Sequence, residues 1–352
     1  QHPEQGGLPN FVPSRGYGRG VSSLWGAACV YLPYYMYCYY GDTRLIAQYW
    51  DAMIHFTKSV WLLTEVNDKP GLLQDRLSDW SSPFGNKPDE GEEVYATMNF
   101  YHVLTMLIEM APIAEKDREI PELQKQKQKL QAAVYKYCFD EQAGVFHGLD
   151  TRDYRQGPNA LALQRGLVKT EHREHVLNRL VHDIAVNRDN HIYGGIFTGH
   201  ALWELMPSEG HADLAYRVAV NDSYPSYGFM LKNGATTLWE HWPDKSSHMH
   251  YFMGFVDNFF YRYLAGINFD TSKPGFKHII FKPQFISAID FVESSYLSIH
   301  GEIKAQWHRT TQGDIEYRVS IPPNCSAKVL LAKRETELAS GSYKLTIRQN
   351  DL

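Results

Sequence analysis

The residues best suited to chemistry lie between Asn233 and Ile267. Glu240 stands there between Trp239 and Trp242, and three histidines follow: His241, His248 and His250. Aromatic rings pack against the C–H faces of sugars, and a partly desolvated carboxylate can exchange a proton near neutral pH. The stretch therefore favours carbohydrate chemistry at Glu240. The competing interpretation makes both tryptophans core residues and lets Glu240 pair with Arg262 or cap a helix.

Two other kinds of site are less compatible with this stretch. His248 and His250, with Asp244 nearby, suggest zinc, but a catalytic zinc site needs a third protein ligand and no HExxH spacing accompanies the pair. A Ser-His-Asp hydrolase would need a G-x-S-x-G turn after a strand, which the chain lacks. We therefore expect neither a metal nor a cofactor.

Composition narrows the class of protein. The 352 residues are 43% hydrophobic and 21% charged, enough for one large domain or two ordinary ones with a sizeable core. A net charge of −5 lacks the basic footprint of a nucleic-acid binder, and no apolar run is long enough to span a bilayer. We therefore expect neither a nucleic acid nor a membrane as partner.

The cysteines and the start of the chain say little about its location. The cysteines show no paired C-x-x-C spacing and indicate neither a disulfide framework nor a zinc site: Cys29, Cys38, Cys138 and Cys325. This count leaves the compartment open, and a secreted or periplasmic location is favoured over a cytoplasmic one. The chain opens without Met in a loop-like segment, so we expect that residue 1 is not the natural start.

Hydrophobic periodicity divides the chain into a helical and a strand-rich part. Apolar residues at helical spacing predict helices over 24–40, 43–63, 92–113, 115–139, 159–167, 173–186, 199–206, 212–221 and 250–265. Short alternating runs then predict strands over 278–281, 289–295, 300–307, 315–321, 327–331 and 343–347. We expect a helical domain over residues 1–270 and an antiparallel β-sandwich over 271–352.

The helical part looks like a closed ring of helix pairs. Its helices are joined by short turns marked by glycine or proline, and no fixed-period repeat supports an open solenoid. In such a toroid the chemistry gathers in the loops at one end of the helices. The loop Leu77-Ser78-Asp79-Trp80 is therefore a second candidate segment.

These motifs together resemble the α-L-rhamnosidases of glycoside hydrolase family 78. Each is weak alone, but they follow the family's order along nearly the whole chain: Gly7–Pro13, Trp25–Ala28 with Pro33, Tyr40–Asp42, Leu77–Trp80, Asn233–Glu240, Tyr261–Ile267, His300–Ile303 with Trp307, and Ile321–Asn324. The resemblance implies a mainly α protein with a β domain. Its fold would be an (α/α)6 toroid, lacking its first helices, followed by an antiparallel β-sandwich.

The resemblance also implies a reaction. Members hydrolyse terminal α-L-rhamnosyl residues with inversion, which requires an acid and a base about 6.5–9.5 Å apart. Glu240 matches the general base, and Trp25 and Trp80 match aromatic residues of the rhamnose pocket. The remaining expected substrate-binding residues are Asp79, Trp242, His250 and His300, the last from the β-domain. The implied partner is a rhamnose-containing glycoside or polysaccharide.

Some family features are missing. The general acid belongs to an acidic, arginine-containing motif ending Gly-Trp-Thr-Gly-Asp, and the chain has no such motif. Many members carry an acidic or polar residue where this chain has Ala27. Many carry asparagine where this chain has Met249. Four carboxylates are candidates for a substitute acid, of which only Asp79 lies in a motif-bearing loop: Asp79, Glu92, Glu93 and Glu204. We expect the acid, the first helices and the N-terminal β-domains in a preceding portion of the enzyme, and little activity from these residues alone.

Two other functions remain open. A toroid that keeps its aromatic pocket but lacks an acid would be a sugar-binding module or an inactive relic. A toroidal glycosidase acting on another sugar, such as a uronic acid, would need paired arginine or lysine residues in its pocket. The loops of this chain are not rich in such pairs.

Overall fold

The structure is a computed structural model that describes residues 7–11, 21–75, 77–83, 85, 87–243, 245–331 and 334–351. Most of the loop expected over residues 1–20, and Asp244 from the zinc hypothesis, lie outside these ranges. Within them, no helix is both long enough and apolar enough to cross a membrane.

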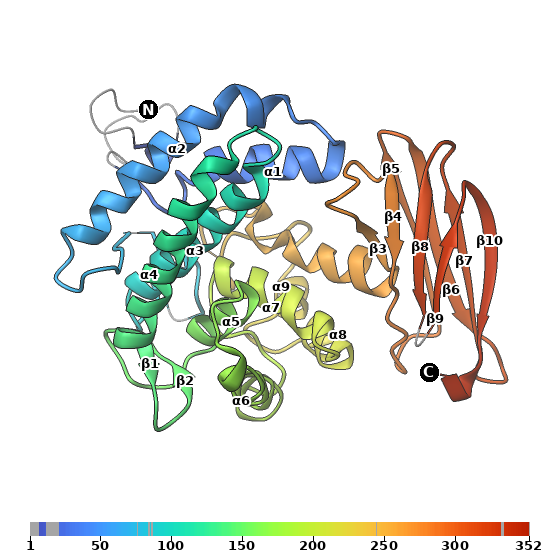
Figure 1. Cartoon of the computed structure of the whole chain (residues 1–352). Helices are drawn as coiled ribbons and strands as arrows, with labels where there is room; N and C mark the ends of the chain where they lie inside the picture. Colours follow the sequence, from blue (N-terminus) through green and yellow to red (C-terminus); the bar gives the residue numbers. More distant parts are fainter. Residues whose placement is uncertain are drawn as a thin grey trace. The chain divides into compact units, whose positions relative to one another are not determined.

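Helices occupy most of the chain up to residue 264 (Figure 1). The α-helices are α1 (Ala28–Tyr40), α2 (Arg44–Glu65), α3 (Glu93–Met110), α4 (Ile120–Cys138), α5 (Gln156–Gln164), α6 (Thr170–His182), α7 (Ile196–Ser208), α8 (Ala212–Val220) and α9 (Tyr227–Lys232). Short 3-10 helices are η1 (Asp117–Glu119), η3 (Tyr251–Val256) and η5 (Gln349–Asp351), and π-helical turns are η2 (Asp183–Asn187) and η4 (Phe259–Leu264).

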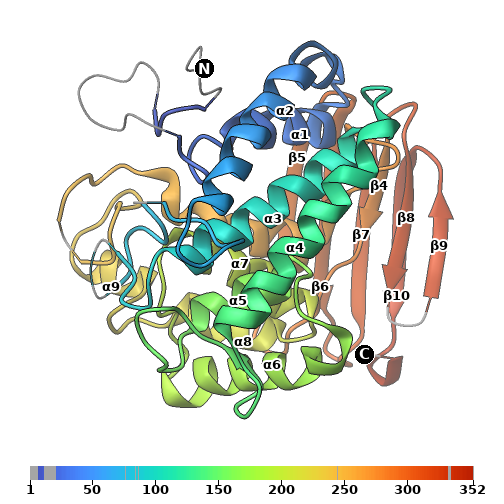
Figure 2. The ribbon, with the colours of Figure 1, turned by 60° about the vertical axis from the view of Figure 1, so that its left-hand side comes forward.

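The burial of the helices follows their sequence pattern. Helix α2 buries one stripe at three- and four-residue spacing, which includes Trp50, Met53 and Phe56. Helix α3 is buried around most of its circumference, and α4 lies beside it in both Figure 1 and Figure 2. The helix expected over 250–265 is instead the 3-10 turn η3 followed by the π turn η4, and α9 was not expected.

The chain divides into two compact units that interleave in sequence. The first contains residues 1–34, 44–205 and 217–254, and the second contains 35–43, 206–216 and 255–352. The second unit thus includes short helical segments as well as the strands. The boundary expected at residue 270 stays a prediction.

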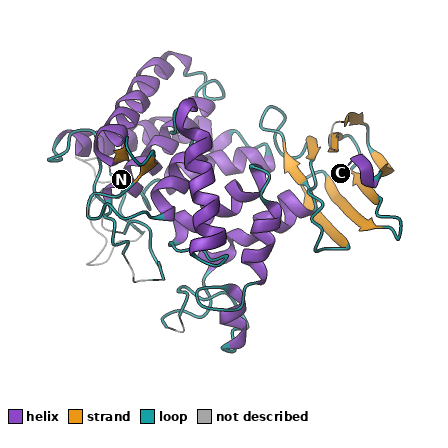
Figure 3. Cartoon of the chain, turned by 90° about the horizontal axis from the view of Figure 1, so that it is seen from below, coloured by secondary structure: helices purple, strands orange, loops and turns teal. Residues whose placement is uncertain are grey.

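The strands gather in the C-terminal part of the chain (Figure 3). They are β3 (Ile267–Phe269), β4 (His278–Phe281), β5 (Phe291–Ser298), β6 (Gly301–Arg309), β7 (Ile315–Ile321), β8 (Ser326–Leu331), β9 (Arg334–Leu338) and β10 (Gly341–Ile347), besides the short pair β1 (Phe139–Asp140) and β2 (Val145–Phe146). Among the described residues, the later strands form two four-stranded sheets, ordered β10-β7-β6-β5 and β3-β4-β8-β9.

One pairing differs from the antiparallel sandwich expected. Strand β4 pairs with β8 in parallel, with Ile279 opposite Ala327, whereas the other pairs are antiparallel. The parallel pair is possible because three strands and their connections separate β4 from β8 along the chain. Strand β9 was missed because it is a charged, mostly exposed edge strand without hydrophobic alternation.

The second unit has its own apolar core. Alternate residues of β6 and β7 point into it, among them Ile303, Trp307 and Tyr317. The polar atoms of the two large rings are paired with main-chain carbonyls at the end of η4 and directly after it. Trp307 Nε1 donates to the carbonyl of Leu264 at 2.8 Å, and Tyr317 Oη donates to that of Ala265 at 3.0 Å. These bonds let polar rings be fully buried.

Candidate active site

Glu240 lies in a tight loop whose two arms are joined by main-chain hydrogen bonds. The amide of Glu240 donates to the carbonyl of Ser247 at 2.9 Å, and the amide of His250 donates to that of Leu238 at 2.8 Å. This pairing places Ser246, with a φ of 64°, beside the Glu240 side chain. The carboxylate keeps only 17% of its side-chain surface exposed.

Both carboxylate oxygens of Glu240 accept hydrogen bonds. Trp80 Nε1 donates to Oε1 at 3.2 Å, and Ser246 Oγ donates to Oε2 at 2.9 Å. Burial raises the pKa of Glu240, but these hydrogen bonds and the nearby imidazoles of His241 and His250 outweigh it and leave the pKa below its usual value. The group is therefore an oriented, ionised carboxylate at neutral pH.

The loop that carries Trp80 is attached to the N-terminus of α7. Asp79 accepts from the amides of Gly195 (2.7 Å), Phe197 (2.8 Å) and Thr198 (3.1 Å), and from the Thr198 hydroxyl (2.6 Å). These amides have no partner within a helix, and a carboxylate there is favoured by the helix dipole. Trp80 adds a bond from its carbonyl, which accepts from the amide of Ile196 at 2.9 Å.

The expected role of Asp79 as a sugar-hydroxyl partner stays a prediction. Asp79 is fully buried, and both of its oxygens are occupied by the N-terminus of α7. Burial raises the pKa of its carboxyl, against the four hydrogen bonds that lower it. In this structure Asp79 positions the Trp80 loop.

The Gly194–Gly195 turn before α7 also receives the Glu240 loop. Trp242 Nε1 donates to the carbonyl of Gly194 at 3.2 Å, and its ring packs edge-on against Tyr227 at 5.7 Å. Trp242 is 2% exposed and supports the loop, and its expected role as a sugar contact stays a prediction. A Cβ on Gly195 would lie 2.2 Å from the Trp80 carbonyl oxygen. Glycine is needed here because two backbones meet.

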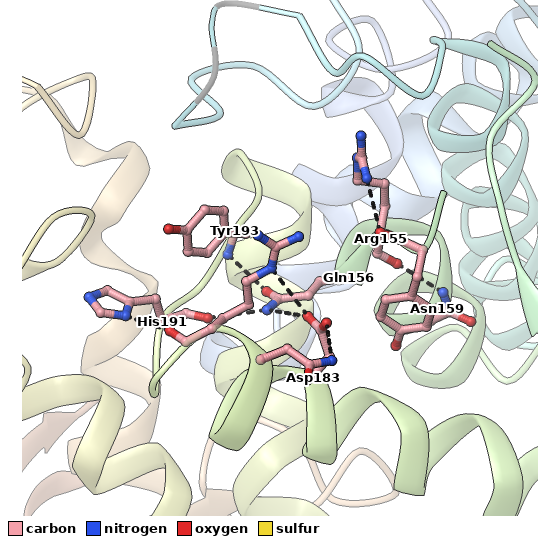
Figure 4. Close-up of polar contacts among 9 residues, drawn as sticks. Arg155, Gln156, Asn159, Asp183, His191 and Tyr193 are labelled. Atoms are coloured by element: carbon pink, nitrogen blue, oxygen red, sulfur yellow. Dashed lines mark hydrogen bonds and ion pairs between the residues drawn. The ribbon is translucent and has the colours of Figure 1, made fainter. Parts of the chain in front are cut away.

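The segment leading into this turn is held by a buried polar cluster (Figure 4). Gln156 Nε2 donates to Asp183 Oδ2 at 3.1 Å and to the carbonyl of His191 at 3.2 Å. Gln156 Oε1 accepts from the amide of Tyr193 at 2.8 Å. The face of Tyr193 is covered by the Arg188 guanidinium, 4.5 Å from the ring centroid. These contacts fix the main chain just before Gly194.

Trp25 approaches α7 from the start of the chain. Its ring is partly exposed and lies edge-on to Phe197, with 5.9 Å between centroids. The turn before it is built on Asp75, whose Oδ2 accepts from the amides of Ser23 (2.7 Å) and Leu24 (3.2 Å). The N-terminus of α7 therefore connects the segments of Trp25, Trp80 and Glu240.

The two remaining candidates have different settings. His250 is partly exposed beside the Glu240 loop, and its ring stacks on Tyr251 at 5.2 Å. His300 belongs to the second unit, where its amide donates to Ser298 Oγ at 3.2 Å. Their roles in sugar binding stay predictions. Among the residues described, no group of three metal-binding side chains is found.

The chain matches two known family models. Residues 1–264 match the bacterial alpha-L-rhamnosidase 6 hairpin glycosidase domain, and residues 266–346 match the bacterial alpha-L-rhamnosidase C-terminal domain. The chain belongs to the bacterial α-L-rhamnosidase family. The expected family is thereby confirmed, as is the expected class of fold, a helical six-hairpin toroid followed by a β domain.

Individual relatives can be aligned with most of this chain. An α-L-rhamnosidase of Formosa agariphila is 29% identical over 331 residues, covering 89% of this chain and 34% of the relative. One from Streptomyces avermitilis is 27% identical over 368 residues, covering 98% and 33%. The chain thus spans about a third of the length of these curated relatives.

Solved structures give the same result. The α-L-rhamnosidase from Dictyoglumus thermophilum has a TM-score of 0.86 and 26% identity over 97% of this chain and 41% of its own. The Streptomyces avermitilis enzyme, solved with L-rhamnose, has a TM-score of 0.84 and 25% identity over 98% of this chain and 35% of its own.

Sequence reasoning missed the residues that hold the site together. These are Asp75, Gly194, Gly195, Thr198 and Ser246. The Gly194–Gly195 pair just before an apolar helix was a visible signal of close backbone contact. The pairing of Ser246 with Glu240 had no such signal, because it depends on how the loop folds back.

Proposed function

We propose that this chain contributes the base half of an inverting α-L-rhamnosidase site. The observation that carries the proposal is the Glu240 carboxylate, ionised and held between Trp80 and Ser246. An inverting base must be ionised to take a proton from water, and it must be fixed in direction toward the anomeric carbon.

The neighbours of Glu240 suit this role. The Trp80 indole orients Oε1, and its ring, partly exposed, is available as an apolar wall for a sugar face. Trp25 supplies a second partly exposed ring at the same helix terminus. No cofactor is required for this chemistry, since acid and base together cleave the glycosidic bond.

The proposed general acid lies outside these 352 residues, about 6.5–9.5 Å from Glu240 when the site is assembled. Glu240 would take the proton of the attacking water while that acid protonates the leaving oxygen. The proposed substrate is a terminal α-L-rhamnosyl residue, as the L-rhamnose in the Streptomyces avermitilis structure suggests. We expect the isolated 352 residues to show little hydrolysis.

Replacement of the base tests the proposal. In the full-length protein, Glu240→Gln should lower kcat on an aryl α-L-rhamnoside by about 10²–10⁴-fold, because the amide cannot accept the proton of water. Glu92→Gln, which changes a carboxylate elsewhere in the first unit, should leave kcat near that of the wild type. Near wild-type turnover by Glu240→Gln would remove Glu240 from the mechanism.

Binding distinguishes the other functions. Calorimetry with L-rhamnose, L-fucose and D-glucuronate should show a preference for L-rhamnose. L-rhamnose binding without hydrolysis by the full-length protein would indicate a sugar-binding module. A preference for D-glucuronate would indicate a different toroidal enzyme.

A further inference from the structure

A chain of buried polar side chains runs from the Trp80 loop into α3. It begins at Asp79, whose Oδ2 accepts from the Thr198 hydroxyl at 2.6 Å. The Thr198 hydroxyl also lies next to the hydroxyl of Tyr95, which lies on α3 and is 1% exposed; both would meet a Cβ on Gly157. Asp79 and Thr198 have no measurable exposure, so water does not replace these contacts.

This series of polar contacts continues to two further acids, Glu90 and Asp89. Tyr95 Oη donates to Glu90 Oε1, and the Glu90 side chain is hydrogen-bonded to Asp89. Asp89 ends the chain in a two-pronged ion pair with Arg155, at 3.0 Å to Nε and 2.6 Å to Nη2. Burial raises the pKa of Glu90 to about 8, and the Arg155 hydrogen bonds hold that of Asp89 at about 2. A protonated Glu90 that donates to an ionised Asp89 satisfies both groups.

A glycine makes room for the Tyr95 and Thr198 hydroxyl groups in the middle of this series of polar contacts. A Cβ on Gly157 would lie 1.9 Å from Tyr95 Oη and 2.6 Å from Thr198 Oγ1. Gly157 lies in the first turn of α5, next to Gln156. Helices α3, α5 and α7 therefore meet at these two hydroxyl groups.

We propose that Tyr95 and Glu90 are positioning residues for the catalytic base, acting through Thr198 and Asp79 on the Trp80 indole that holds Glu240. This inference rests on the proposed function of Glu240. The physical basis is connectivity. Asp79 immediately precedes Trp80, is bound on all sides, and leaves the tryptophan little freedom to move unless the Thr198–Tyr95 contact is lost.

The test follows the Trp80 ring directly. The full-length protein is labelled with 5-fluorotryptophan, and the ¹⁹F line of Trp80 is identified by its absence in Trp80→Phe. Tyr95→Phe keeps the ring but removes the hydroxyl, and it should shift or broaden that line. On an aryl α-L-rhamnoside it should lower kcat about 10–100-fold with little change in KM, because misplacement of a catalytic group affects the reacting complex most.

Tyr101→Phe is the matched control. Tyr101 lies on the same helix, is buried, and donates its hydroxyl to the carbonyl of Gly166 at 3.4 Å instead. It should leave the Trp80 line and kcat unchanged. An unchanged Trp80 line in Tyr95→Phe, or an equal shift in Tyr101→Phe, would overturn the proposal.

A second pair of variants serves if Tyr95→Phe does not fold. Glu90→Gln can still accept from Tyr95 and donate to Asp89, so it should keep the wild-type line, whereas Glu90→Met should shift it. Equal lines for these two variants would contradict the proposed chain. If the wild type hydrolyses no rhamnoside, the proposed function fails, and the fluorine line still reports whether Tyr95 positions Trp80.

Discussion

The two oxygens of Glu240 have different partners, and this difference can be tested at the level of one residue. Trp80 belongs to a separate, tightly held loop, whereas Ser246 lies six positions along the same loop. Removing the Ser246 hydroxyl should mainly change the acidity of Glu240, since Trp80 still orients it. Its loss destabilises the ionised form and therefore raises the pKa of Glu240.

Ser246→Ala should accordingly move the acidic limb of the kcat/KM profile to higher pH. A hydrogen bond worth about 0.5–1 kcal/mol at this exposed position corresponds to less than about one pH unit. Ser247→Ala is the control, because Ser247 Oγ donates to the Met249 carbonyl at 3.1 Å. If the acidic limb moves equally in both variants, or in neither, Ser246 does not specifically lower the pKa of Glu240.

At the level of elements, the N-terminus of α7 organises the site. Amides at the start of α7 donate to Asp79, and the Ile196 amide donates to the Trp80 carbonyl. The Gly194 carbonyl accepts from Trp242. Two loops distant in sequence thus take their positions from a single turn. That turn depends on the absence of a side chain at Gly195.

Gly195→Ala should therefore displace the Trp80 loop. The new Cβ would lie 2.2 Å and 2.4 Å from the carbonyl oxygens of Trp80 and Asp79, and backbone cannot rotate away as a side chain can. We expect a loss of about 1–3 kcal/mol in the free energy of unfolding, measured by urea denaturation. Gly254→Ala, whose Cβ would make an ordinary 3.6 Å contact with Leu238, should cost less. Equal losses would argue against steric exclusion at Gly195.

For the whole molecule, the buried Glu90 links stability to pH. Burial raises its pKa from 4.5 to about 8, so folding favours the protonated form. The stabilising contribution is full below about pH 4.5 and is lost as pH rises through about 8. The free energy of unfolding should fall over this range by an amount on the order of a few kcal/mol.

Glu90→Gln should weaken that fall, because an amide does not titrate. Urea denaturation at a series of pH values measures it, with Glu92→Gln as the control for the loss of one carboxylate from the first unit. The same slope in wild type and Glu90→Gln would show that Glu90 does not titrate as its burial implies.

The sequence determined the classes of structure and the residue of greatest chemical interest. Helical and alternating periodicities predicted the helical part and most strands, since both depend on local spacing and one buried face. Strands β4 and β7 were predicted at their observed bounds. The aromatic flanks of Glu240 drew attention to it for a similar reason, because unusual residue types stand close together in the chain.

Only the tertiary structure decided what each neighbour does. Trp242 and Asp79 have the residue types of a sugar site, and their burial and hydrogen bonds show that they also support the loops. Conversely, Ser246, Thr198 and Gly195 have no distinctive pattern and derive their importance from contacts. Burial and hydrogen-bond partners depend on segments far apart in sequence, and local spacing carries no information about which of them meet.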